Sequence, residues 1–256
     1  MAGFAGKGLN LNIGSRKQWT NIPGSPSTQA ITTDFDLNGK AAIGLNLNRD
    51  KSGLIQRLRA VGTFAYHLPL DEEGRAISFG ISMGMMNERI NLEDVRGDQN
   101  DINLGRFNER QTYLDGDFGA AYTSNNMTFQ AAIPNLKEFL KKDQMEGTVD
   151  RAIFFSAVSY KFKGEGNLGI DFEPKAVYRV INGTDNILDV GANIIFANRV
   201  NFFGMYHSSQ SATLGLGMIY QNLGFSGIYN TSTGNLSQYP GGNFEINLHA
   251  RLFGKK

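Results

Sequence analysis

The chain has 256 residues and no break in composition, and all-β barrels of this length commonly form one domain, so we expect a single domain over residues 1–256. Its 25 Lys and Arg residues nearly balance its 24 Asp and Glu residues, so no overall charge favours nucleic acid as a partner. The lack of Cys excludes disulfide bonds and thiolate metal sites.

The start of the chain and its most apolar region restrict how it can enter a membrane. Residues 1–6 lack the charged and apolar regions of a secretory signal, so for an exported protein we expect the signal peptide and the extreme N-terminus to be absent from this sequence. The most apolar region, Asn193–Tyr206, is interrupted by Asn198, Arg199 and Asn201, which excludes a membrane-spanning helix. A β-barrel is the only other structure that spans lipid.

Period-two alternation in segments of about ten residues dominates the sequence and indicates strands with one apolar and one polar face. In the last segment, Phe244, Ile246 and Leu248 share one face, while Glu245 and Asn247 share the other. We count about fourteen strands, which start near Gly8, Thr28, Ala41, Gln56, Arg75, Tyr113, Met127, Arg151, Asn167, Asn186, Val200, Ala212, Gly224 and Gly242. An even number of antiparallel strands is typical of a transmembrane up-and-down barrel in a bacterial outer membrane.

The connections between these strands alternate in length, as expected when short turns face the periplasm and longer loops face outward. The predicted periplasmic turns are Leu37–Lys40, Asp71–Arg75, Ser124–Asn126, Lys163–Gly166, Ala197–Arg199 and Gln221–Gly224. The connections predicted on the outer side include Thr20–Ser27, Asn48–Ile55, Asn87–Thr112, Pro134–Asp150, Ile181–Asp185 and Thr231–Gly241. A soluble β-sandwich has no reason to sort its loops in this way, so the alternation favours a barrel.

Small residues occupy many of the positions predicted to face the lumen. In two segments small residues alternate with large apolar residues: Ser78, Gly80, Ser82 and Gly84 in the first, and Gly215 and Gly217 in the second. These small residues predict space in the lumen for other side chains or a ligand. The strand from Arg151 carries aromatic residues on both faces, which suggests that it packs against a plug or a partner.

Four acidic residues, Asp115, Asp117, Asp171 and Glu173, form pairs two positions apart and therefore merely share a strand face. We expect them to form lumen ion pairs with Arg57, Arg59, Arg179 or Arg251, in preference to an acid/base catalytic site. No Ser lies in a G-x-S-x-G nucleophile elbow, because Gly80–Gly84, which has these letters, falls inside a predicted strand, so a hydrolase is the least supported alternative. We expect no catalytic residue and no enzymatic activity.

Neither a cofactor nor a metal ion is predicted from the remaining motifs. Gly164–Gly169 matches G-x-G-x-x-G, but a strand follows it where a dinucleotide site needs a helix, so we interpret it as a hairpin turn. His67, His207 and His249 lack the close spacing of metal ligands and are expected in the lumen or at the membrane interface.

Two predicted outer loops carry the candidate partner-binding residues. Asn87–Thr112 is long and charged, which makes it our first choice of recognition surface. Leu136–Lys142 has helical periodicity and either contacts a partner or lipid headgroups, or is a solvated loop helix, the interpretation we favour. The candidates are Trp19, Arg89, Asp94, Arg96, Arg106, Arg110, Lys137, Phe139 and Lys141.

Several short elements resemble those of one family in order and spacing. Arg16–Trp19 and Gly24–Thr28 resemble the R-x-Q-W and G-x-P-x-T element near the start of PorP/SprF proteins of type IX secretion systems. Later matches to the family pattern are Gly44–Gly53 with its D-x-x-G turn, Ser78–Gly80, Ile133–Leu136 and the closing strand Gly242–Ile246. The resemblance extends over nearly the whole chain.

This resemblance implies an outer-membrane component of type IX secretion in Bacteroidota that exports or surface-anchors secreted proteins, such as gliding adhesins, through their C-terminal domains. It also implies periplasmic-ring and peptidoglycan-binding proteins as partners, with outer-membrane lipid around the barrel. It implies no catalytic residue. The alternative that the residues themselves leave open is a passive channel or a transporter of hydrophobic solutes.

Overall fold

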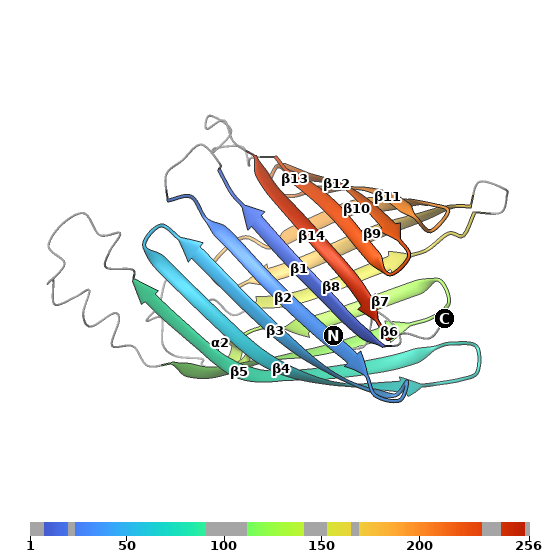
Figure 1. Ribbon diagram of the computed structural model, residues 1–256, viewed down its shortest axis with the longest axis horizontal. Coiled ribbons are helices and arrows are strands. Elements are labelled where there is room, and N and C mark those ends of the chain that lie inside the picture. The colour runs from blue at the N-terminus through green and yellow to red at the C-terminus, as the bar shows by residue number, and fades with distance from the viewer. Residues whose placement is uncertain are drawn as a thin grey trace, which may run out of the picture.

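The computed structural model describes residues 8–19, 24–90, 112–140, 153–164, 169–231 and 242–253, which form a closed antiparallel barrel (Figure 1). The strands are β1 (Leu9–Lys17), β2 (Ser27–Asp36), β3 (Ala41–Ser52), β4 (Ile55–Pro69), β5 (Ala76–Ile90), β6 (Tyr113–Thr123), β7 (Met127–Ile133), β8 (Ile153–Tyr160), β9 (Ile170–Ile181), β10 (Ile187–Phe196), β11 (Val200–His207), β12 (Ser211–Tyr220), β13 (Leu223–Asn230) and β14 (Asn243–Leu252). Each strand pairs with its neighbours in sequence, and β1 pairs with β14 to close the barrel. The predicted architecture and strand order are confirmed.

One short helix, α2 (Leu136–Leu140), follows β7. No helix in the described ranges has the length and apolar character needed to cross a membrane.

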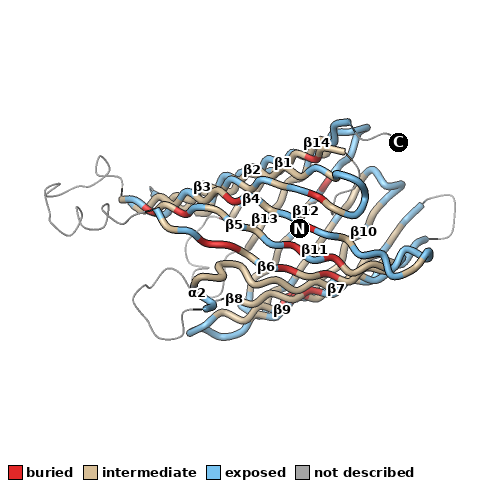
Figure 2. Tube along the Cα trace, turned by 90° about the horizontal axis from the view of Figure 1, so that it is seen from below, coloured by how far each residue is buried: buried red, intermediate tan, exposed pale blue. Residues whose placement is uncertain are grey.

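The apolar face of each strand points away from the barrel axis, as predicted. On β5, Phe79, Ile81 and Met83 are exposed, whereas the intervening Ser78 and Gly80 are buried. Figure 2 shows that the few buried residues are scattered along the strands, and within the described ranges the buried apolar cluster consists of Ala42 and Ala65 alone. Such a continuous apolar surface is unfavourable in water and favourable against lipid acyl chains.

The longest connections gather at one end of the barrel. One end, which we call the long-loop end, carries connections 18–26, 53–54, 91–112, 134–152, 182–186, 208–210 and 231–242. We call the opposite end the short-turn end. The three longest connections, 91–112, 134–152 and 231–242, all lie at the long-loop end, as predicted. Because short turns of outer-membrane barrels face the periplasm, the long-loop end faces outward.

Two predicted connections differ most from the structure. The predicted loop Asn48–Ile55 shrinks to Gly53 and Leu54 because β3 and β4 remain paired up to Ser52 and Ile55. Gly53 has φ +60, a conformation that Gly adopts without strain and that permits this tight turn. At the other end, the predicted turn Lys163–Gly166 lies within a longer connection, 161–169, of which residues 165–168 are outside the described ranges.

The height of the wall is uneven around the barrel. The longest strands are β4 and β5, with 15 residues each, whereas β7 and β8 have 7 and 8 residues. The β4–β5 hairpin is therefore the tallest part of the described wall, and the β7–β8 hairpin is the shortest.

We expect a charge on the lipid face to destabilise the barrel. Leu216 lies midway along β12 and points outward, so Leu216→Arg should lower the free energy of unfolding in phospholipid vesicles by about 2–4 kcal/mol. The matched control Leu216→Met should have little effect. Equal stability of the Arg variant and the wild type would contradict a lipid-facing assignment.

Candidate functional site

Hydroxyl and amide side chains line the lumen on the inner side of β1–β6. Asn12 on β1 is paired with Thr32 on β2, which is paired with Asn46 on β3. One row away, Thr63 on β4 and Ser82 on β5 are also paired, and their hydroxyl oxygens are 2.8 Å apart. Strand register therefore places one polar residue beside the next around this part of the wall.

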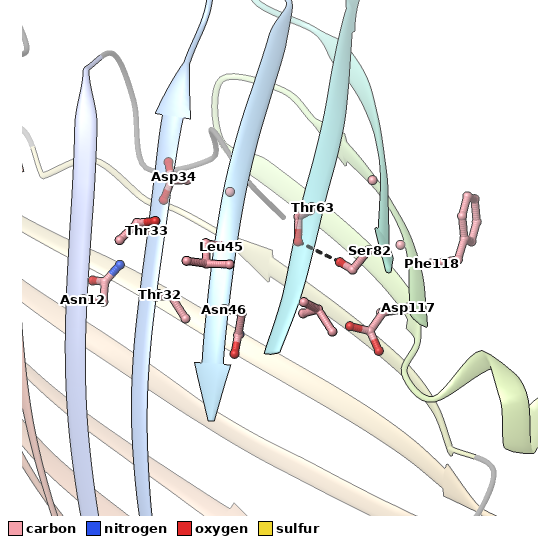
Figure 3. Close-up of a pocket in the computed structure, with 15 residues that line it drawn as sticks. Asn12, Thr32, Thr33, Asp34, Leu45, Asn46, Thr63, Ser82, Asp117 and Phe118 are labelled. Carbon is pink, nitrogen blue, oxygen red and sulfur yellow. Dashed lines mark hydrogen bonds between the residues drawn. The ribbon is translucent and has the colours of Figure 1, made fainter. Parts of the chain in front are cut away.

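These residues border a cavity of about 420 Å³ inside the barrel (Figure 3). Gly44 and Gly80 also line it and contribute no side chain, so space remains between the polar groups. Asp117 of β6 lies at its edge, on the side where Figure 3 shows α2. The cavity can offer hydrogen bonds to a polar solute.

The room predicted from the other lumen glycines is filled. A Cβ atom at Gly215 would clash with the ring of Phe203, its partner on β11. A Cβ atom at Gly217 would clash with the side-chain amide of Asn201 in the same way. The glycines of β12 therefore accommodate neighbouring side chains, which is one of the two uses predicted for these positions.

Ion pairs join the strands β4, β5 and β6 near the long-loop end. Arg59 on β4 donates to Asp117 at 2.6 Å, which confirms one of the predicted lumen pairs. Arg57 donates to Glu88 at 2.7 Å, a partner that was not predicted.

Two other expected ion pairs are different in the structure. Asp171 of β9 pairs with Lys161 at 2.9 Å near the short-turn end. Lys161 directly follows β8, and the pairing of β8 with β9 brings the two residues together. Arg251 donates to the amide oxygen of Asn10 at 3.3 Å across the β1–β14 seam.

A chain of hydrogen bonds joins β9 to β13 and is the largest feature that the sequence analysis missed. Arg179 donates to Asp189 at 2.7 Å, and Asp189 lies 2.7 Å from Nδ1 of His207. Nε2 of His207 is 2.7 Å from the Thr213 hydroxyl, which donates to the side-chain oxygen of Asn230. The short turn between β10 and β11 places Asp189 opposite His207, so hairpin register was the signal that could have revealed this pair.

All three histidines lie on strands, and two of them have a polar contact on the inner wall. His207 contacts Asp189, and Nδ1 of His67 is 2.8 Å from the Ser78 hydroxyl. His249 lies opposite Gly224 on β13. Within the described ranges, no three His, Asp or Glu residues are close enough together to hold a metal ion.

The helix α2 is attached to the barrel wall by the two carboxylates that were considered as a catalytic pair. Asp117 accepts a hydrogen bond from the backbone N–H of Asn135 at 3.1 Å, and Asp115 accepts one from Lys137 at 3.0 Å. Nζ of Lys137 lies 3.5 Å above the ring of Tyr113. These contacts attach the start of the segment to β6, and its interpretation as a solvated loop helix stays a prediction.

The candidate residues that the structure describes all lie near the long-loop end, but they belong to different elements. Trp19 follows β1 and is half-buried, and Arg89 is exposed near the end of β5, where its Nε donates to Asn87 at 2.8 Å. Phe139 in α2 is 46% exposed, whereas Lys137 is engaged with Tyr113. The other candidates, Asp94, Arg96, Arg106, Arg110 and Lys141, lie outside the described ranges. A partner-binding role for these nine residues stays a prediction.

Two aromatic residues of the strand predicted from Arg151 belong to an exposed cluster on the outside of the barrel. Tyr160 contacts Phe162, with ring centroids 4.7 Å apart, and Phe162 contacts Phe172 of β9, with ring centroids 6.3 Å apart. Such a cluster is typical of the aromatic girdle at a membrane interface. Lipid is therefore sufficient to explain these outward rings, without a plug.

Comparison with known proteins gives one family and several barrels. The family model described as type IX secretion system membrane protein PorP/SprF matches residues 1–250. The crystal structure of the outer membrane protein Omp33 of Acinetobacter baumannii is similar with a TM-score of 0.58 at 6% identity, covering 96% of this chain and 98% of that one. The toluene transporter TbuX of Ralstonia pickettii has a TM-score of 0.52 at 12% identity, covering 98% of this chain and 91% of that one. The similarities to Omp33 and TbuX show the fold alone. No curated protein matches the sequence.

We expect the buried carboxylate of Asp189 to hold β9, β10 and β11 together. Asp189 is only 3% exposed, and Asp189→Asn removes the charge that Arg179 and His207 share. Because Arg179 remains partly in water, we expect the free energy of unfolding in detergent micelles to fall by about 1–3 kcal/mol, less than for a fully buried pair. Glu73→Gln, at the exposed turn before β5, is the matched control and should leave the unfolding curve unchanged. Identical curves for both variants would show that the carboxylate is dispensable.

Proposed function

The chain belongs to the PorP/SprF family of type IX secretion system membrane proteins, and on this premise we propose that it is an outer-membrane platform that binds secreted proteins such as gliding adhesins through their C-terminal domains. In this role it helps to export these proteins or to anchor them at the cell surface.

The observation that carries this proposal is the difference between the two ends of the barrel. The long-loop end holds the three longest connections, 91–112, 134–152 and 231–242, and offers exposed groups such as Arg89, Phe139 and Leu140 on the strands and helix that flank them. Binding residues are commonly found on loops that a rigid scaffold holds in position. A secreted protein held at the outer surface would meet this end first.

The contacts on the inner wall favour a binding platform over a wide pore. Ion pairs and filled glycine positions occupy the lumen side of β9–β12, and α2 is attached to the wall at the long-loop end. These contacts make the scaffold rigid. We therefore place recognition of the secreted protein at the mouth of the barrel, and we expect no catalytic step there.

Membership of a secretion family implies that the barrel associates with other secretion components. We propose that the short-turn end contacts the periplasmic ring and peptidoglycan-binding proteins. The turn between β4 and β5 illustrates how rigid this end is, because the Asp71 carboxylate accepts hydrogen bonds from the backbone N–H groups of Glu73 and Arg75.

The first test of the proposal is loop replacement. Replacing residues 92–110 with a short Gly/Ser linker should abolish retention of secreted protein at the cell surface, because it removes the first-choice recognition loop. The barrel should still assemble, as shown by an unchanged heat-dependent shift in gel mobility. The same replacement at 232–240 is the control. Normal retention after the first replacement would contradict this assignment.

A second function, a passive channel, is favoured by one observation, the polar cavity of about 420 Å³ beside β1–β6. Planar bilayers distinguish the two functions. We expect the platform to give no stable single-channel steps, because side chains fill lumen positions along β9–β12. Regular conductance steps from the purified barrel would support the channel instead.

A further inference from the structure

A groove on the lipid-facing wall crosses the place where the barrel closes. The strands β12, β13, β14 and β1 run side by side there, and the pairing of β14 with β1 closes the sheet (Figure 1). The groove has a volume of about 440 Å³ and takes its lining from all four strands. It reaches Leu11 near the start of β1 and Ala250 near the end of β14, so it lies toward the short-turn end.

The strand register explains why the wall is hollow at this point. Ala250 shares the outward face of β14 with Ile246 and Leu248. Its direct neighbours in the two ladders are Leu223 on β13 and Leu11 on β1. The single methyl group of Ala250 therefore leaves a gap between large side chains that project toward the membrane.

The lining of the groove is almost entirely apolar. Among the side chains that line it, only those of Tyr220 and His249 carry a nitrogen or oxygen atom. Tyr220 is the last residue of β12 and is 68% exposed, so it stands at the rim near the short-turn end. An apolar occupant would bury its surface here, whereas a polar solute would lose hydrogen bonds to water that the lining cannot replace.

Positive charge lies next to the rim of the groove. The turn between β10 and β11 carries Arg199, which is exposed, and its backbone carbonyl accepts a hydrogen bond from the N–H of Ile219 at 2.6 Å. This contact places the turn beside the end of β12, where Tyr220 lies. Arg199 and Arg251 are the charged residues in 197–199, 221–222 and 250–253, and these three stretches contain no acidic residue. Arginine is well suited to bind the oxygen atoms of a phosphate group.

We propose that the groove binds one phospholipid of the periplasmic leaflet, with an acyl chain over Ala250 and the phosphate group beside Arg199. An acyl chain fits because it has no hydrogen-bonding group and is narrow enough to enter a gap left by one small side chain. A transmembrane helix is about 10 Å across and is too wide for such a gap. The volume of the groove lies within the range of about 300–1,000 Å³ that is typical of ligand pockets.

The position of the site gives the bound lipid a structural effect. The acyl chain would contact both β14 and β1, whose pairing closes the barrel. A ligand that binds the folded protein and not the unfolded chain stabilises the folded state by mass action. The phospholipid therefore favours the closed barrel, and this inference does not depend on the role of the barrel in secretion.

Native mass spectrometry of the barrel purified in mild detergent tests the site. Ala250→Phe fills the gap with a ring, and Arg199→Gln removes the charge beside the rim. Ala60→Phe is the matched control, because Ala60 lies on β4 between Leu47 and Met85, away from the groove and toward the long-loop end. Heat-dependent gel mobility verifies that each variant is folded, and Ala250→Leu takes the place of Ala250→Phe if the latter does not fold.

We expect the wild type and Ala60→Phe to retain one phospholipid after the detergent is removed, and Ala250→Phe to retain several-fold less. Added phospholipid should also raise the unfolding temperature of the wild type more than that of Ala250→Phe. Equal retention by Ala250→Phe and the wild type would overturn the site, and so would a wild type that retains only detergent, another protein chain or nothing. Unchanged retention by Arg199→Gln would overturn the phosphate contact.

Discussion

Every backbone N–H and C=O group at membrane depth needs a partner within the protein, and the rest of this structure depends on that constraint. The closed ladder meets it for most of the chain, including the seam between β1 and β14. Where β7 is too short, Asp115 and Asp117 meet it with side chains, and a helix of five residues completes the wall. The same requirement that closes the barrel thus governs the place where pairing between β6 and β7 stops.

The inner wall follows a second rule, that charges taken out of bulk water need partners. Asp117 accepts hydrogen bonds from Arg59 and from the backbone N–H of Asn135, so the wall and the residue before α2 share one carboxylate. On the other side of the lumen, Asp189 joins Arg179 to His207 and thereby links three strands. These networks make the barrel a stiff scaffold, while its outer face is adapted to lipid.

Membership of the PorP/SprF family places this scaffold in the outer membrane as a component of type IX secretion. The similarity to Omp33 and TbuX adds the fold and nothing about cargo, because the identities are 6% and 12%. The molecular basis of partner binding must therefore be sought in features of this chain. The unequal ends of the barrel and the low wall at β7 are the features that a uniform channel does not require.

The sequence by itself determined the strands, their order and their lipid-facing sides, because period-two alternation is a local property that survives any choice of register. It did not determine which inward residues meet. Arg59 and Asp117 are separated by 58 positions, and their contact depends on β4, β5 and β6 being tilted and staggered as a closed barrel requires. The attachment of α2 to Asp115 likewise depends on β7 ending early. Only the tertiary structure decided these contacts, since they join strands whose relative positions are set by closure of the whole barrel.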